Sequence, residues 1–106
     1  MIRATTPYHE FVFSENPSEY ERILITYSQE ESIILEKEKS DLTITENPEV
    51  AGQYIASFRM TQAEANEFAI GAVRVQVRIL KSNGDAMASE ISILKIEEVL
   101  DDEVLT

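Results

Sequence analysis

The chain has 106 residues, the usual size of one domain, so we expect a single core that spans residues 1–106. It contains no cysteine, which excludes disulfides and thiolate metal sites. Twenty acidic residues stand against nine basic ones, and the net charge is −11. A surface this acidic repels the phosphates of nucleic acids and of anionic membranes, so we expect neither as a partner.

The first residues and the apolar runs bear on where the protein is found. Residues 1–7 have no apolar core of the kind that a secretory signal peptide needs. The unbroken apolar runs are far shorter than the ~20 residues that a membrane-spanning helix requires. We therefore expect a soluble protein that lies in the cytoplasm when it is synthesised.

In the first half of the chain, aromatic and β-branched residues gather in short segments separated by turn-forming residues, a pattern typical of β-strands. The segment 22–27 is apolar on both faces, which predicts a central strand. Pro7 and Pro48 stand at the ends of segments, where proline is tolerated. We expect strands at residues 8–13, 22–27, 32–37, 42–45 and 53–59.

The spacing of the apolar residues changes after residue 60 from that of a strand to that of a helix. Thr61 and Glu64 have the spacing of a capping box, in which a hydroxyl and a carboxylate satisfy the free N–H groups at the start of a helix. Gly71 is placed to end this helix. With fewer than three turns the helix is unstable alone, so we expect it to pack on a sheet through Phe68.

The C-terminal part predicts a hairpin of two strands, 73–80 and 86–96, and its apolar pattern fixes the pairing. A two-residue loop at 83–84 would bury Glu90, whereas a three-residue loop at 82–84 matches apolar residues with apolar residues. The longer loop places Gly84 in the left-handed region. It also sets Gln76 against Glu90 on the outer face, and its apolar pairs are Ile79 with Met87, Val75 with Ile91, and Val73 with Ile93.

The pattern as a whole is mainly β: about seven strands and one short helix near residues 61–70. Short strands at this spacing predict an immunoglobulin-like antiparallel β-sandwich. An α+β roll is the alternative if the helix is longer. From about residue 97 the chain continues as an acidic tail.

The chain offers little for catalysis or metal binding. His9 is the only histidine and lies on a strand pattern, which favours a structural role. The paired glutamates stand among polar neighbours, where burial would not raise a pKa. The hairpin accounts for residues 82–85, which resemble part of a calcium loop, and the acidic residues 101–103 are typical of a solvated tail. We expect no enzyme activity, no cofactor and no metal.

The strongest sign of a contact surface is a surplus of apolar and arginine residues outside the expected core. Arg74 and Arg78 lie on the outer face of one strand, where they form charge pairs with Glu90 or a protein-contact patch. The last strands carry a second apolar face, covered by the helix or by another chain, and apolar pairs follow on the tail. The candidate interface residues are Arg74, Arg78, Leu94, Ile96, Val99, Leu100, Val104 and Leu105.

Four segments carry a family resemblance: 5–11 (TTPYHEF), 24–29 (LITYSQ), 61–71 (TQAEANEFAIG) and 75–80 (VQVRIL). They resemble small phage and prophage proteins of Gram-positive bacteria, and their order is similar to the N-terminal domain of phage baseplate upper proteins. The resemblance implies a non-enzymatic structural or assembly protein, a tail or baseplate adaptor that contacts other phage structural proteins or further copies of itself. It also implies the host cytoplasm at synthesis, then the virion, and no catalytic residue.

The acidic charge supports an alternative function. A protein with carboxylates spaced like phosphates can occupy the cleft of a nucleic-acid-binding protein. The alternative is therefore an acidic phage inhibitor of a host nucleic-acid-binding protein, a DNA mimic.

Overall fold

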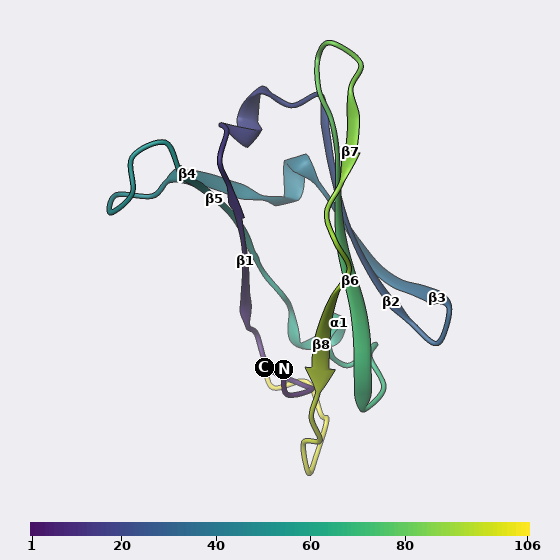
Figure 1. The fold of residues 1–106 in the computed structure, drawn as a ribbon. Coiled ribbons are helices and arrows are strands. Elements are labelled where there is room, and N and C mark those ends of the chain that lie inside the picture. The colour runs from purple at the N-terminus through teal and green to yellow at the C-terminus, as the bar shows by residue number, and fades with distance from the viewer.

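The computed structural model describes all 106 residues as two antiparallel β-sheets that pack face to face (Figure 1). The five strands expected in the first half are confirmed, with ends within two residues of those expected. In chain order the strands are β1 (Tyr8–Phe13), β2 (Arg22–Gln29), β3 (Ser32–Glu38), β4 (Thr43–Glu46), β5 (Tyr54–Arg59), β6 (Gly71–Leu80), β7 (Ala86–Ala88) and β8 (Ser92–Ile96). The helical turns are α1 (Gln62–Ala65) and the two 3₁₀ turns η1 (Pro17–Glu19) and η2 (Lys39–Asp41).

The strand order is that of an immunoglobulin-like sandwich. One sheet has the order β1-β5-β4, and the other has β3-β2-β6, with β7 and β8 both paired to the far side of β6. In immunoglobulin terms these are the orders B-E-D and C′-C-F-G. The full order places strand A beside strand B, which corresponds to β1. Within the 106 residues that position is open, so β1 is an edge strand.

The core lies between the sheets. Its largest fully buried side chains include Tyr27 on β2 and Phe68 in the α1–β6 connection. The ring of Phe68 lies 5.8 Å from that of Tyr27, which confirms that this connection packs on the sheet through Phe68. The other buried core residues are Tyr20, Ile23, Ile25, Phe58, Met60, Ala65, Val73, Val75 and Ile96.

The helix is shorter than predicted. The capping box forms, because the Thr61 hydroxyl accepts from the Glu64 N–H and the Glu64 carboxylate accepts from the Thr61 N–H. Yet α1 is a single turn, and Gly71 begins β6 instead of ending a helix. The buried Gln29 side chain donates to the Ala69 carbonyl at 2.7 Å and accepts from its N–H at 2.8 Å. Ala69 therefore cannot make the backbone bonds of a longer helix. Neither α1 nor any other helix is long and apolar enough to cross a membrane.

The β6–β7 turn follows the prediction, and the pairing beyond it does not. Ile79 lies opposite Met87, and Gly84 has φ +94°, as a three-residue loop requires. Past Ala88, however, the outer strand contains one extra residue. The predicted pairs of Val75 with Ile91 and of Val73 with Ile93 are therefore wrong. Val75 lies opposite Ser92, and Val73 lies opposite Leu94.

The shift in pairing has a physical reason. In the predicted register Lys95 would point into the core, and Ile96 would point out to solvent. The bulge reverses both, so Ile96 is fully buried and Lys95 is exposed. Ser89 makes the bulge possible: its hydroxyl accepts from the Val77 N–H at 3.0 Å, and its own N–H donates to the Val77 carbonyl at 2.8 Å.

Candidate protein-contact groove

One edge of β1 has no neighbour. Pairs in an antiparallel ladder alternate between residues that exchange both backbone hydrogen bonds and residues that exchange none. The Met60 N–H donates to the Pro7 carbonyl at 2.9 Å, and β1 continues in the same register along β5. The odd-numbered residues of β1 therefore face β5. Tyr8, Glu10 and Val12 direct their N–H and C=O groups to the open edge.

The facing edge of the other sheet is formed by β7 and β8. The bulge interrupts it, and Glu90 and Ile91 pair with nothing on β6. The far end of β8 is covered by the first residues of the chain: the amino group of Met1 donates to the Lys95 carbonyl at 2.6 Å, and the Arg3 N–H donates to the Glu97 carbonyl at 3.2 Å. The uncovered part of this edge therefore lies beside β1.

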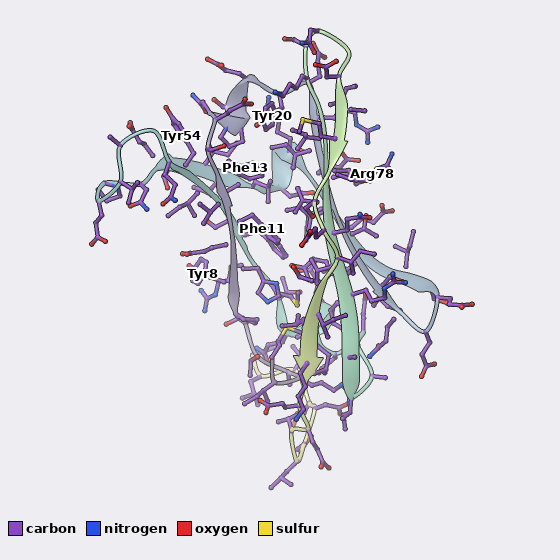
Figure 2. All side chains as sticks on the ribbon, viewed as in Figure 1. Tyr8, Phe11, Phe13, Tyr20, Tyr54 and Arg78 are labelled. Atoms are coloured by element: carbon purple, nitrogen blue, oxygen red, sulfur yellow. The ribbon has the colours of Figure 1, made fainter.

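A groove of about 640 Å³ lies between these two edges. The inner face of β6 contributes Val77 and Ile79, and β1 contributes Phe11 and Phe13. Figure 2 shows Phe11 and Phe13 pointing from β1 toward the opposite sheet, whereas Tyr8 points away. All four groove side chains are only half-buried, and Met87 at the rim is 55% exposed. The groove therefore exposes part of the apolar core.

The groove continues toward β8. A second hollow of about 400 Å³ shares Glu10, Phe11, Val75 and Ser92 with the first, and it extends to Ile93. Ile93 is 67% exposed. The two hollows together follow β1 over its length, which is about 20 Å for six residues at the usual rise of a strand.

The charge of the groove is negative. Glu10 and Glu90 are the two charged residues that line it, and neither Lys nor Arg does. Neither carboxylate takes part in an ion pair, since the four ion pairs of the structure involve Asp102, Glu38, Glu64 and Glu15. The groove thus combines an apolar floor with unpaired negative charge.

His9, on β1, lines the second hollow beside Glu10 and Phe11. Its Nδ1 lies 2.5 Å from the Tyr27 hydroxyl, and its ring packs 5.6 Å from the ring of Phe58. Burial and the positive chain terminus lower the pKa of His9, and burial and the charge of Glu64 raise that of Tyr27. Because both shifts favour the neutral forms, this pair links the two sheets as a neutral hydrogen bond.

The two arginines of the candidate interface lie on the outer face of the second sheet, as expected from their alternation. Arg78 points away from β1 in Figure 2. The predicted pairing with Glu90 is wrong, because Arg74 lies opposite Ile93 and Arg78 opposite Ala88. The four ion pairs include neither arginine. Their role in a contact surface stays a prediction.

The apolar candidates on the last strand are core residues. Ile96 has no exposed area, and Leu94 is half-buried against the core cluster. Ile96 therefore cannot lie on a contact surface, and that prediction is wrong. The second apolar face expected from Leu94 and Ile96 is the inner face, and the exposed face carries Ile93 instead.

The acidic tail folds back on α1. The Gln62 side chain donates to the Leu105 carbonyl at 2.8 Å and accepts from its N–H at 2.7 Å. Asp102 forms an ion pair with Arg3 at 3.2 Å. Of the candidate residues in the tail, Leu100 and Leu105 remain strongly exposed, while Val99 is half-buried and Val104 lies beside α1.

The amino-acid pattern does not distinguish the groove residues from other core residues. Phe11, Phe13, Val77 and Ile79 follow a regular alternation, which assigns them to a core without indicating that the core is open on one side. The strand count gave no signal either, because the seven predicted strands equal the number in a seven-stranded immunoglobulin domain, and only the observed order β1-β5-β4 shows that β1 corresponds to B, not A. No group of three or more His, Asp or Glu side chains is arranged to hold a metal ion, and residues 82–85 form the β6–β7 turn.

No protein-family model matches the chain, and neither curated proteins nor solved structures provide a match.

Proposed function

We propose that this protein is a non-enzymatic structural or assembly component of a phage particle, a tail or baseplate adaptor that acts through contacts with other phage structural proteins. The observation that carries the proposal is the groove between β1 and the β7–β8 edge, where half-buried Phe11 and Phe13 face solvent. Exposed apolar surface beside unpaired strand edges is typical of sites that another protein covers. The assignment to a phage particle rests on the resemblance to baseplate upper proteins.

The side chains favour binding over catalysis. A general base must reach the proton that it abstracts, but His9 is engaged with the Tyr27 hydroxyl. The carboxylates that line the groove are Glu10 and Glu90, on opposite sheets, with apolar residues between them. Such a surface is suited to hold another chain.

The test is mass spectrometry of purified phage particles beside the cleared lysate of the induced producing strain. A structural component is expected in the particle at a fixed stoichiometry, in a multiple set by a symmetric ring. Cross-linking of intact particles should then join lysines of this protein to a second phage protein. Detection in the lysate alone would contradict a virion role and would favour the acidic inhibitor of a host protein.

A further inference from the structure

The groove has the features that a β-strand requires of a binding site. Tyr8, Glu10 and Val12 present their N–H and C=O groups at the open edge of β1, and such a row is a template for another strand. The position beside β1 is the one that the first strand takes in the immunoglobulin order. The geometry thus favours an extended segment over a helix, which cannot pair with a strand edge.

The apolar floor sets the pattern of the segment. Every second side chain of an added strand points between the sheets, where Phe11, Val77 and Ile79 are half-buried. Apolar side chains at these positions would complete the open side of the core. The length of β1 allows about six or seven residues. The outward positions lie beside Glu10 and favour basic residues, because opposite charges stabilise cross-strand neighbours.

Charge argues against a second copy of this chain as the occupant. Two β1 strands related by a twofold axis, with all three free residues paired, would set Glu10 against Glu10, which is destabilising. The exposed C-terminal tail fits no better, because residues 98–106 contain four carboxylates and no basic residue. The occupant that the charge fits is a basic segment from a different protein.

We propose that the groove binds an extended segment of another protein, which pairs antiparallel with β1 and alternates apolar residues with lysine or arginine. The proposal rests on the proposed function, because it names the contact through which an adaptor would hold its neighbour. Main-chain hydrogen bonds supply affinity in this mode of recognition, and the alternate side chains supply specificity.

The experiment uses the full chain and a synthetic probe: a capped seven-residue peptide in which valine alternates with lysine, threonine and lysine. Amide hydrogen exchange is followed by NMR with and without the peptide. We expect the amides of Tyr8, Glu10 and Val12 to exchange slowly only when the peptide is present. A matched peptide with glutamate in place of both lysines should bind on the order of tenfold more weakly. The reason is that both substituted side chains would then be repelled by Glu10 instead of attracted to it.

Two substitutions of Glu10 test the contact: Glu10→Pro changes the backbone and the charge together, and Glu10→Lys changes the charge alone. Glu10→Pro removes an N–H that points away from β5, so the β1–β5 ladder should persist while peptide protection is lost. Glu10→Lys keeps the backbone and should reverse the preference between the two peptides. Glu49→Lys, in the exposed loop after β4, makes the same charge change away from the groove and should leave both affinities unchanged.

Each other outcome overturns the proposal. Equal binding of both peptides would remove the charge argument, and protection at β3 or β4 would place the strand at another edge. Self-association in sedimentation that Glu10→Pro abolishes would make a second copy the occupant. These results concern the groove alone: a protein found in particles whose β1 edge does not bind the peptide would keep its proposed function and lose this mode of contact.

Discussion

The two ends of the sandwich contain similar apolar residues, but these residues are buried to different extents. Along β6 alone, Val73 is fully buried at one end and Ile79 is half-exposed at the other. At the closed end, α1, the tail and the first residues of the chain cover the core, and Phe68 lies under them. At the open end, no strand pairs with the free edge of β1, and the groove separates β1 from β7.

The difference indicates that the closed end contributes most to folding stability and that the open end is available for binding. The closed end uses polar side chains as links: Gln29 holds the irregular backbone at Ala69, and His9 on β1 is hydrogen-bonded to Tyr27 on β2. The open end leaves aromatic side chains half-covered, which costs burial energy within the single chain. We expect substitutions at the closed end to change folding and substitutions at the open end to change binding.

The largest expected effect compares one core residue with one rim residue. Phe68→Ala removes a fully buried ring and should lower the free energy of unfolding by about 3–5 kcal/mol. Met87→Ala, at a side chain that is 55% exposed, should cost less than about 1 kcal/mol. Urea denaturation followed by circular dichroism measures both. Equal losses would show that the open end is as well packed as the closed end.

The next comparison uses the same substitution on two glutamines of one sheet. Gln29→Leu leaves the N–H and C=O of Ala69 without partners, which should cost about 2–3 kcal/mol. Gln76→Leu removes only an exposed bond to the Ser89 carbonyl, so its expected change is within about 0.5 kcal/mol. Thermal unfolding of both variants gives the answer, and a stable Gln29→Leu protein would contradict the fastening role.

The sequence predicted the strands well because alternation and turn residues are local signals. It also placed Gly84 correctly, since a three-residue loop needs a residue in the left-handed region at that position. It failed at Ser89, because a serine that takes the place of a backbone partner leaves no trace in an apolar pattern. The bulge there reversed the faces of the last strand, and the prediction for Ile96 failed with it.

The predicted length of the helix was wrong for a related reason. The capping box at Thr61 was a local signal and is confirmed, whereas the end of α1 depends on Gln29, 40 residues away in the chain from Ala69. The open groove depends on the pairing of whole strands. The sequence could predict the strand β1, but not that the structure leaves one of its edges free.

A smaller effect is expected at the β2–β3 turn, where Glu30 and Glu31 have φ values of 51° and 66°. Two-residue hairpin loops of this kind favour Asn-Gly, because left-handed backbone is unfavourable for other residues. The double substitution Glu30→Asn with Glu31→Gly should stabilise the protein by about 1–2 kcal/mol. At the β6–β7 turn the reverse holds, and Gly84→Ala should destabilise by about 1 kcal/mol. The midpoints of urea denaturation distinguish the two signs.

The smallest expected effect compares two glutamates, Glu64 at the closed end and Glu15 at the open end, whose pKa values are both lowered. Burial alone would raise the pKa of Glu64 at the closed end, but hydrogen bonds from Lys37 and from Thr61 outweigh it, and the pKa falls below its usual 4.5. A depressed carboxyl pKa stabilises the fold above pH 4.5, and this contribution is lost as the pH falls through the folded-state value.

Glu64→Gln should therefore cost about 1 kcal/mol at pH 7 and progressively less below pH 4.5, because the wild-type contribution itself disappears there. Glu15 at the open end also has a lowered pKa, owing to hydrogen bonds from Tyr20 and Lys81, but its carboxylate is exposed to solvent. Water screens such a contact, so Glu15→Gln should leave the pH profile of stability nearly unchanged. Urea denaturation from pH 3 to pH 7 compares the two. A flat profile for Glu64 would mean that its contact with Lys37 is as solvated as that of Glu15, and the contrast between the ends would then rest on apolar burial alone.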